Sequence, residues 1–182
     1  MEIVHSIFET KRLLVKPLRL EDAPAYQKYF NDYEVISHLS RKVPWPYPED
    51  GALSYLKFVL PLQGIDRWDW GIFEKSNPDE CIGSIGIFKK GIPEHRGFWL
   101  AQKHWGKGYM TEAVEPVTSY AFDELGFTEL LLSNAKGNER SRRLKEKVGA
   151  EFLYLKSSEL VNPDYKESEI WRLTKEAWKA RS

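Results

Sequence analysis

The chain is poor in cysteine and carries no surplus of charge of either sign. Cys81 is the single cysteine among 182 residues, which excludes an internal disulfide and a metal cluster held by cysteines alone. A lone cysteine also fits a reducing compartment. Lys and Arg together number 27, and so do Asp and Glu. A general electrostatic nucleic-acid binder needs a basic surplus, so this class is disfavoured, whereas a local basic patch stays compatible with the composition.

Long apolar runs are also missing. No stretch approaches the roughly 18 consecutive apolar residues that a membrane-spanning helix requires. The first six residues, Met1 to Ser6, lack the basic segment and the apolar run of a signal peptide. The four histidines are too scattered along the chain to indicate a metal site. We therefore expect a cytoplasmic protein that binds neither a membrane nor a metal ion.

Hydrophobic residues nevertheless make up 42% of the chain and aromatic residues 14%, which excludes global disorder. A chain of this length fits one domain and buries roughly 70% of the surface that it exposes when unfolded. Periodicity and turn residues predict a meander, then strand–helix–strand–helix–strand, then a closing hairpin. This order predicts an α+β domain around one mixed sheet. The expected strands are 12–18, 67–75, 80–88, 96–101, 128–133, 152–155 and 169–173, and the expected helices are 23–33, 49–60, 109–125 and 139–148.

The strongest local signal is a short loop with two glycines between a strand and a helix. Strand 96–101 leads to Gly106 and Gly108, after which a helix is expected. The start of a helix exposes unpaired N–H groups and the positive end of its dipole, so such a loop can hold a phosphate. The alternative is a tight turn that needs glycine for its own backbone geometry. The patterns of a P-loop and of a dinucleotide-binding fold are both missing.

Segments along nearly the whole chain fit one known pattern. In chain order they are RLL at 12–14, LED at 20–22, FWLA at 98–101, HWGKGYMTEA at 104–113, AFDELGF at 121–127, NERS at 138–141, EKVGA at 146–150 and a closing strand at 171–178. Together they resemble the GNAT superfamily of N-acetyltransferases. Within it, they are most similar to the branch of the ribosomal-protein-alanine and ribosomal-protein-serine N-acetyltransferases. The resemblance extends over residues 10–178.

This resemblance implies a fold and a reaction. It implies a single N-acetyltransferase domain over residues 10–178, with a central, mixed and strongly twisted sheet of about seven strands flanked by about four helices. Two splayed parallel strands, 96–101 and 128–133, would form a notch for acyl-CoA. Acetyl-CoA would be the cosubstrate, no metal would take part, and a primary amine would attack the thioester directly. The most favoured acceptor is the α-amine of a protein N-terminus, and a homodimer is compatible with the pattern.

The resemblance also assigns contacts to acetyl-CoA. Its pyrophosphate would lie on the N–H groups of residues 105–111, and its pantetheine amides would bond to Asn134 and Asn138. Two positions depart from the common pattern, because many members carry Gln or Arg at Trp105 and Gly or Ala at Met110. The residues expected to contact the cosubstrate are Phe98, Trp99, Leu100, Trp105, Gly106, Lys107, Gly108, Tyr109, Met110, Thr111, Asn134, Asn138 and Ser141.

Three residues are candidates for catalysis. His95 and Glu159 are candidate bases, since the attacking amine must lose a proton; strand alternation places Glu94 on the opposite face from His95. Ser141 is the candidate proton donor to the leaving thiolate. Each has a simpler interpretation: a solvated histidine at a strand edge, a surface carboxylate and a serine that bonds backbone at a helix start. Asn138 can equally be a helix cap.

Several further features have a structural and a functional interpretation. The basic run at 140–147 is either a solvated helix face or an attraction for the phosphates of CoA. Cys81 lacks a neighbouring histidine, so we expect a core residue rather than a nucleophile. Trp45, Tyr47, Trp68 and Trp70 belong either to the core or to the wall of an acceptor pocket. Three functions besides protein acetylation stay open: acetylation of small amines, binding of acyl-CoA without turnover, and binding of another phosphate ligand.

Overall fold

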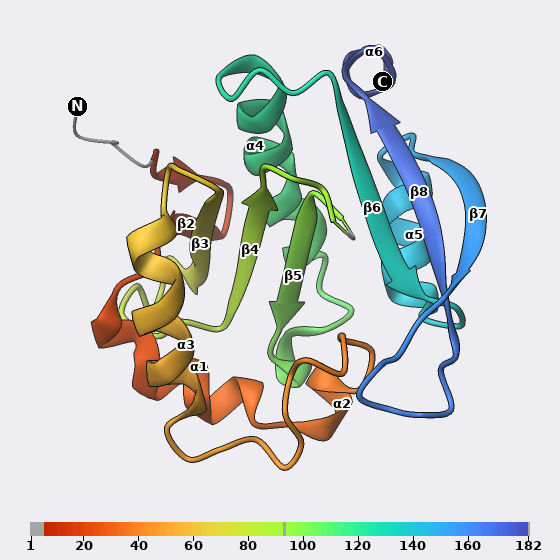
Figure 1. Ribbon diagram of the computed structural model, residues 1–182. Coiled ribbons are helices and arrows are strands. Elements are labelled where there is room, and N and C mark those ends of the chain that lie inside the picture. Colours follow the sequence, from red (N-terminus) through yellow and green to blue (C-terminus); the bar gives the residue numbers. More distant parts are fainter. Residues whose placement is uncertain (1–5, 93, 182) are drawn as a thin grey trace.

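The computed structural model describes residues 6–92 and 94–181 and places the strands in two antiparallel sheets. The larger sheet has five strands in the order of the chain, and the smaller sheet has three strands in the order β6-β8-β7 (Figure 1). Each strand pairs antiparallel with its neighbours within its sheet. The strands are β1 (Phe8–Glu9), β2 (Leu13–Pro17), β3 (Arg67–Glu74), β4 (Gly83–Phe88), β5 (Arg96–Leu100), β6 (Glu129–Ala135), β7 (Glu151–Ser157) and β8 (Glu167–Thr174).

The two sheets meet where β5 and β6 run side by side in the same direction (Figure 1). At the start of β5 the two strands are joined, because the His95 N–H donates to the Leu131 carbonyl over 2.7 Å. Beyond this point they are not paired and belong to separate sheets. The expected splayed parallel strands are therefore present. The single mixed sheet is instead two antiparallel sheets with a parallel junction.

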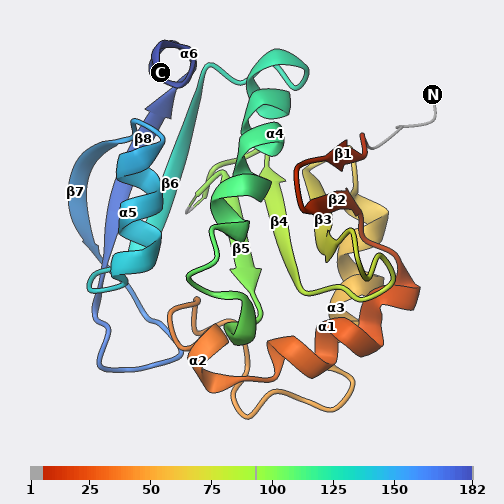
Figure 2. The same ribbon diagram turned by 180° about the vertical axis from the view of Figure 1, so that it is seen from behind.

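Helices cover both faces of the larger sheet. Figure 2 shows α4 in front of the larger sheet and α5 in front of the smaller one, whereas α1 and α3 pack on the other face of the larger sheet. The helices are α1 (Ala23–Phe30), α2 (Tyr33–Ile36), α3 (Gly51–Val59), α4 (Tyr109–Asp123), α5 (Glu139–Lys147) and α6 (Lys175–Ala180), with single 3-10 turns at Leu20–Asp22, Leu60–Leu62 and Gln102–His104. One buried cluster lies under α4 and the other under α1 and α3. No helix among the described residues has the length and apolar character needed to cross a bilayer.

The buried stripe of α4 follows the predicted helical period. Ala113, Val114, Val117 and Ala121 have no exposed surface, so this helix is fixed against the sheet by its apolar face. Burying each such side chain contributes roughly 1–3 kcal/mol. This packing fixes α4 against the larger sheet, and its first turn follows the short loop after β5.

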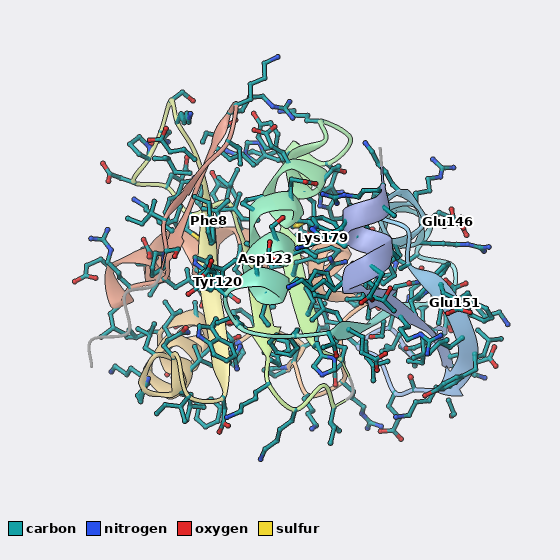
Figure 3. The ribbon with its side chains drawn as sticks, turned by 90° about the horizontal axis from the view of Figure 1, so that it is seen from above. Phe8, Tyr120, Asp123, Glu146, Glu151 and Lys179 are labelled. Atoms are coloured by element: carbon teal, nitrogen blue, oxygen red, sulfur yellow. The ribbon has the colours of Figure 1, made fainter. Side chains whose placement is uncertain are left out.

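The end of the chain differs from the prediction of a closing strand over 171–178. Strand β8 stops at Thr174, whose hydroxyl accepts from the Ala177 N–H, and α6 begins at the next residue. Threonine is a favoured N-cap residue, and its hydrogen bond to the Ala177 N–H stabilises a helix start where the strand was expected to continue. Asp123 on α4 then holds the short helix, because Lys175 and Lys179 each reach its carboxylate over 3.1 Å. Figure 3 shows the Lys179 side chain near Asp123.

Candidate functional site

A cavity of about 370 Å³ opens where β5 and β6 part. Its walls come from α2, β5, the loop before α4, β6 and α5. All the residues that the sequence assigned to cosubstrate contact line this cavity, except Lys107. The predicted set is therefore brought together in one place, from segments as distant along the chain as Phe98 and Ser141.

The glycine loop at one end of the cavity has the backbone conformation that requires glycine. Gly106 and Gly108 have φ angles of +73° and +77°, in the left-handed region that other residues adopt only with strain. Gly108 is the N-cap of α4, and within residues 6–92 and 94–181 no side chain caps the first N–H groups of this helix. Its first turn lines the cavity, so these amides and the positive end of the helix dipole offer what an anion site needs. The tight turn that needs glycine and the uncapped helix start are here the same feature.

Arg140 and Trp105 close the cavity across the notch. The Arg140 guanidinium lies 3.8 Å from the centre of the Trp105 ring, and the Trp105 Nε1–H donates to the Leu100 carbonyl over 2.8 Å. This stack links α5 to the loop that follows β5, and it places a positive charge on the wall of the cavity. Arg140 is the member of the basic run that lines this cavity.

Ser141 lies in the first turn of α5 and lines the cavity. Its Oγ accepts a hydrogen bond from Lys145 Nζ over 2.8 Å. Its backbone N–H donates to Asn138 Oδ1 over 3.3 Å, so Asn138 caps the helix as the simpler interpretation held. Lys145 is only 1% exposed. For this residue, the expectation of a solvated helix face is wrong.

Glu94 lines the same cavity from the segment just before β5. Its Oε2 accepts from both the N–H and the hydroxyl of Ser133, over 3.1 and 2.8 Å. The carboxylate thus spans from β5 to β6 at the point where the strands separate. Burial raises the pKa of Glu94, against the opposing effects of Lys145, the Ser133 hydrogen bonds and Arg96.

His95 lies outside the cavity, on the opposite face from Glu94 as strand alternation predicted. Its Nδ1 accepts the Leu131 N–H over 2.8 Å, and its ring packs edge-on against Phe127 at 5.4 Å. Burial lowers the pKa of His95. The accepting nitrogen is therefore occupied by the junction between the sheets, which is a structural role.

Glu159 lies on the loop between β7 and β8, away from the main cavity. Its side chain is 80% exposed and forms an ion pair with Arg41 over 3.6 Å. It lines a neighbouring pocket of about 440 Å³, and Leu160 lies on the wall of both pockets. Of the three predicted catalytic residues, only Ser141 thus faces the space between β5 and β6.

Two buried polar groups near the notch have unused bonding capacity. Arg96 is 3% exposed, and its Nη1 donates to Thr118 Oγ1 over 3.4 Å. Among the described residues, its Nε and Nη2 have no hydrogen-bond partner. Burial lowers the pKa of Arg96 to about 10. Asn134 donates to Glu169 Oε2 over 3.0 Å, while its own Oδ1 is buried without a partner in the same described part of the chain. This orphaned acceptor fits an amide N–H of a pantetheine chain.

Sequence reasoning assigned Glu94, Arg96 and Lys145 no individual role in the site. A signal for Lys145 was present, because it follows Ser141 by four residues and therefore lies on the same helical face. His95 was preferred to Glu94 as the candidate base. The alternation of side chains along a strand indicates that the two residues lie on opposite faces, but it does not indicate which face lines the notch.

The other expectations divide between core and surface. Cys81 has no exposed surface, and burial raises the pKa of its thiol to about 12. It is therefore a core residue and not a nucleophile. Trp70 and Tyr47 are core residues, at 0% and 8% exposed, and Trp68 packs against the core, whereas Trp45 is 44% exposed. None of the four lines the main cavity, so an acceptor wall built from them stays a prediction. Among the described residues, no group of three His, Cys, Asp or Glu side chains is placed to hold a metal ion.

Comparisons with known proteins point in one direction. The family described as the acetyltransferase (GNAT) domain matches residues 12–151. The uncharacterized N-acetyltransferase YoaA of Bacillus subtilis is 30% identical over 148 residues, which cover 79% of this chain and 81% of YoaA. The FsC-acetyl coenzyme A-N(2)-transacetylase of Aspergillus fumigatus is 29% identical over 185 residues, which cover 93% of this chain and 76% of that relative. The structure of RimL, a ribosomal L7/L12 alpha-N-protein acetyltransferase in complex with coenzyme A, superposes with a TM-score of 0.78 at 15% identity. The superposition covers 94% of this chain and 99% of the RimL chain.

Proposed function

The chain belongs to the GNAT acetyltransferase family, and we propose that it transfers an acetyl group from acetyl-CoA directly to the α-amine of a protein. The observation that carries this proposal is the open cavity between β5 and β6, which leads from the uncapped start of α4 to Ser141 and Glu94. An N-acetyltransferase needs a phosphate site, a proton acceptor and a proton donor around one thioester. This cavity offers all three.

The donor end of the cavity fits acetyl-CoA. The free N–H groups in the first turn of α4 and the Arg140 charge suit the pyrophosphate. The unpartnered Oδ1 of Asn134 suits a pantetheine amide. Bound acetyl-CoA supplies the thioester whose carbonyl the amine attacks. The unpaired edges of β5 and β6 would orient that thioester between the two sheets.

Glu94 is the proposed base, in place of His95 and Glu159. An α-amine near pH 7 is largely protonated and must lose a proton before its lone pair can attack. The Glu94 carboxylate faces the cavity, and burial makes it a stronger base than an ordinary glutamate. Its Oε1 is not used in the two bonds with Ser133. Ser141, at the opposite wall, is the proposed donor of the proton that the departing thiolate takes up.

The acceptor end supports a peptide as substrate. Here the cavity is lined by Glu34, His38 and Leu160 and adjoins the second pocket around Arg41 and Glu159. The pockets share Leu160, so an extended chain could lie across both with its amino end near Glu94. RimL, which has the same fold, is named for α-N-protein acetylation.

A small amine is the second candidate acceptor. The relative from Aspergillus fumigatus, which is similar over most of its length, is named an FsC-acetyl coenzyme A-N(2)-transacetylase, and its name mentions no ribosomal protein. A cavity of about 370 Å³ is of the size that small ligands occupy. The homodimer and the cytoplasmic location both stay predictions.

The acceptor is tested by offering two panels under identical conditions. One panel holds peptides with different first residues, each paired with the same peptide blocked at its α-amine, and the other holds small amines. We expect mass spectrometry to find one acetyl group at the α-amine of peptides that start with Ala or Ser, and none on the blocked peptides. Products from the small amines alone would refute the protein acceptor and favour the second candidate.

A further inference from the structure

Lys145 is a buried lysine for which the reaction proposed above has no use. Its side chain is 1% exposed, and within the described residues it forms no ion pair with a carboxylate. Nζ donates to Ser141 Oγ over 2.8 Å and approaches the Ser141 carbonyl at 3.5 Å. Burying an unpaired ammonium is costly. A methionine or leucine would fill the same space without that cost, so the charge itself calls for an explanation.

Charged groups from two other segments face Lys145. Glu94 and Arg96 lie just before and at the start of β5, and Glu169 belongs to β8, where it pairs with Arg142 of α5 at 3.7 Å. Burial and the positive charge of Arg96 together lower the pKa of Lys145 to about 7, against the opposing effects of Glu94 and Glu169. Near neutral pH this side chain therefore exchanges readily between ammonium and amine. An ordinary lysine holds its proton far too firmly to do so.

The hydrogen bond also orients Ser141. Because Oγ accepts from Lys145 Nζ, its own hydrogen is free to point toward the cavity that Ser141 lines. A serine hydroxyl alone is a poor acid, since giving up its proton leaves an alkoxide. A neighbouring ammonium removes this obstacle if it passes a proton to Oγ as the hydroxyl proton leaves. We propose that Lys145 acts in this way, as a positioning residue that supplies, through Ser141, the proton taken up by the departing CoA thiolate.

The protons and electrons of this step balance. Glu94 first passes the ammonium proton of the acceptor to solvent. The neutral amine nitrogen then forms its bond to the carbonyl carbon, the C=O π pair moves to oxygen, and the nitrogen yields its second proton to Glu94; the π pair returns as the C–S bond breaks. When the C–S bond breaks, its electron pair stays on sulfur, which takes the Ser141 proton while Lys145 reprotonates Oγ. Glu94 then releases its proton to solvent, and Lys145 takes one from solvent. This inference rests on the proposed acetyl transfer, and it adds a residue that touches neither substrate.

The test compares Lys145→Met with Lys147→Met, an exposed lysine on the same helix. Single-turnover rates are measured from pH 5.5 to 9.5 with saturating acetyl-CoA. For the native enzyme we expect the rate to fall as pH rises above about 7, where Lys145 loses its proton. Lys145→Met should lower the rate about 100-fold at pH 7 and abolish that fall, with the affinity for CoA changed less than about two-fold. Lys147→Met should match the native enzyme throughout.

A double-mutant cycle separates the relay from a structural role. If Lys145 acts only through Ser141, then Lys145→Met should change the rate less than about two-fold in a Ser141→Ala background. Two results would overturn the relay while leaving acetyl transfer intact. One is a double variant whose rate loss equals the product of the two single losses, and the other is a Lys145→Met rate that is lowered equally at every pH. A native enzyme that acetylates no amine would overturn the proposed function and the relay together. If Lys145→Met does not fold, the NMR titration of the Lys145 Cε in the native protein decides, and a midpoint near 10 contradicts the inference.

Discussion

Replacing Gly108 by alanine tests whether the first turn of α4 holds the pyrophosphate of CoA. Gly108 has a φ of +77°, and a Cβ there would lie 3.5 Å from Arg12 Nη2, which is ordinary contact. The cost to folding is therefore the left-handed backbone alone, about 1–2 kcal/mol. The methyl group would stand among the N–H groups to which the phosphates would bond.

Gly126 provides a matched control for this variant. It has the same φ of +77°, and a Cβ there would meet nothing within 4 Å. It follows the far end of α4, and it does not line the cavity. Gly126→Ala should thus carry a similar backbone cost without any effect on CoA. The comparison removes the general effect of strain on stability.

The expected loss of affinity follows from the bonds that the methyl group displaces. A hydrogen bond to a charged group contributes about 1.5–3 kcal/mol, and losing one weakens binding about 10- to 100-fold. Isothermal titration with CoA should show this loss for Gly108→Ala and none for Gly126→Ala, while urea unfolding shows both destabilised alike. A folded Gly108→Ala, or the bulkier Gly108→Trp, with native affinity for CoA would refute the placement.

Three further predictions concern the groups around the notch. Glu94→Gln should lower kcat about 100-fold, whereas His95→Gln should keep it within about two-fold; the reverse result would restore His95 as the base. Because the folded-state pKa of Lys145 is lowered to about 7, the unfolded chain binds more protons between that value and the ordinary lysine pKa of about 10.4, so stability should rise with pH across this window. Lys145→Met should remove that rise in urea titrations, and an unchanged pH dependence would argue against the lowered pKa. Glu112 accepts from Thr10 Oγ1 and from the Arg12 N–H and Nε, so Glu112→Ala should cost about 1–3 kcal/mol of unfolding free energy, and a loss below about 0.5 kcal/mol would show that these bonds do not anchor α4.

The parts of the site that depend on local backbone could be predicted from the sequence. Gly106 and Gly108 adopt the left-handed conformation that only glycine takes without strain, and they lead directly into α4. Asn138 was recognised as a possible cap because its side chain bonds within its own turn. Such features are decided by residues that are close along the chain.

The parts that depend on tertiary packing could not be predicted. Which of Glu94 and His95 faces the notch follows from how β5 separates from β6, and nothing near residue 94 encodes that separation. Lys145 was grouped with a solvated run because most lysines are exposed, yet α5 presses this one against the sheet junction. The parallel junction also depends on tertiary packing. The Leu131 N–H donates to the side-chain Nδ1 of His95, whereas in a regular strand pair it would donate to a backbone carbonyl.

The most direct test of the whole account is amine-dependent release of the CoA thiol from acetyl-CoA. The native enzyme should release thiol in proportion to an added peptide that starts with Ala or Ser, one thiol for each acetylated α-amine, and Ser141→Ala should slow this release while still binding CoA. Confirmed CoA binding with no thiol release above background, for every peptide and every small amine, would contradict acetyl transfer in the cavity between β5 and β6.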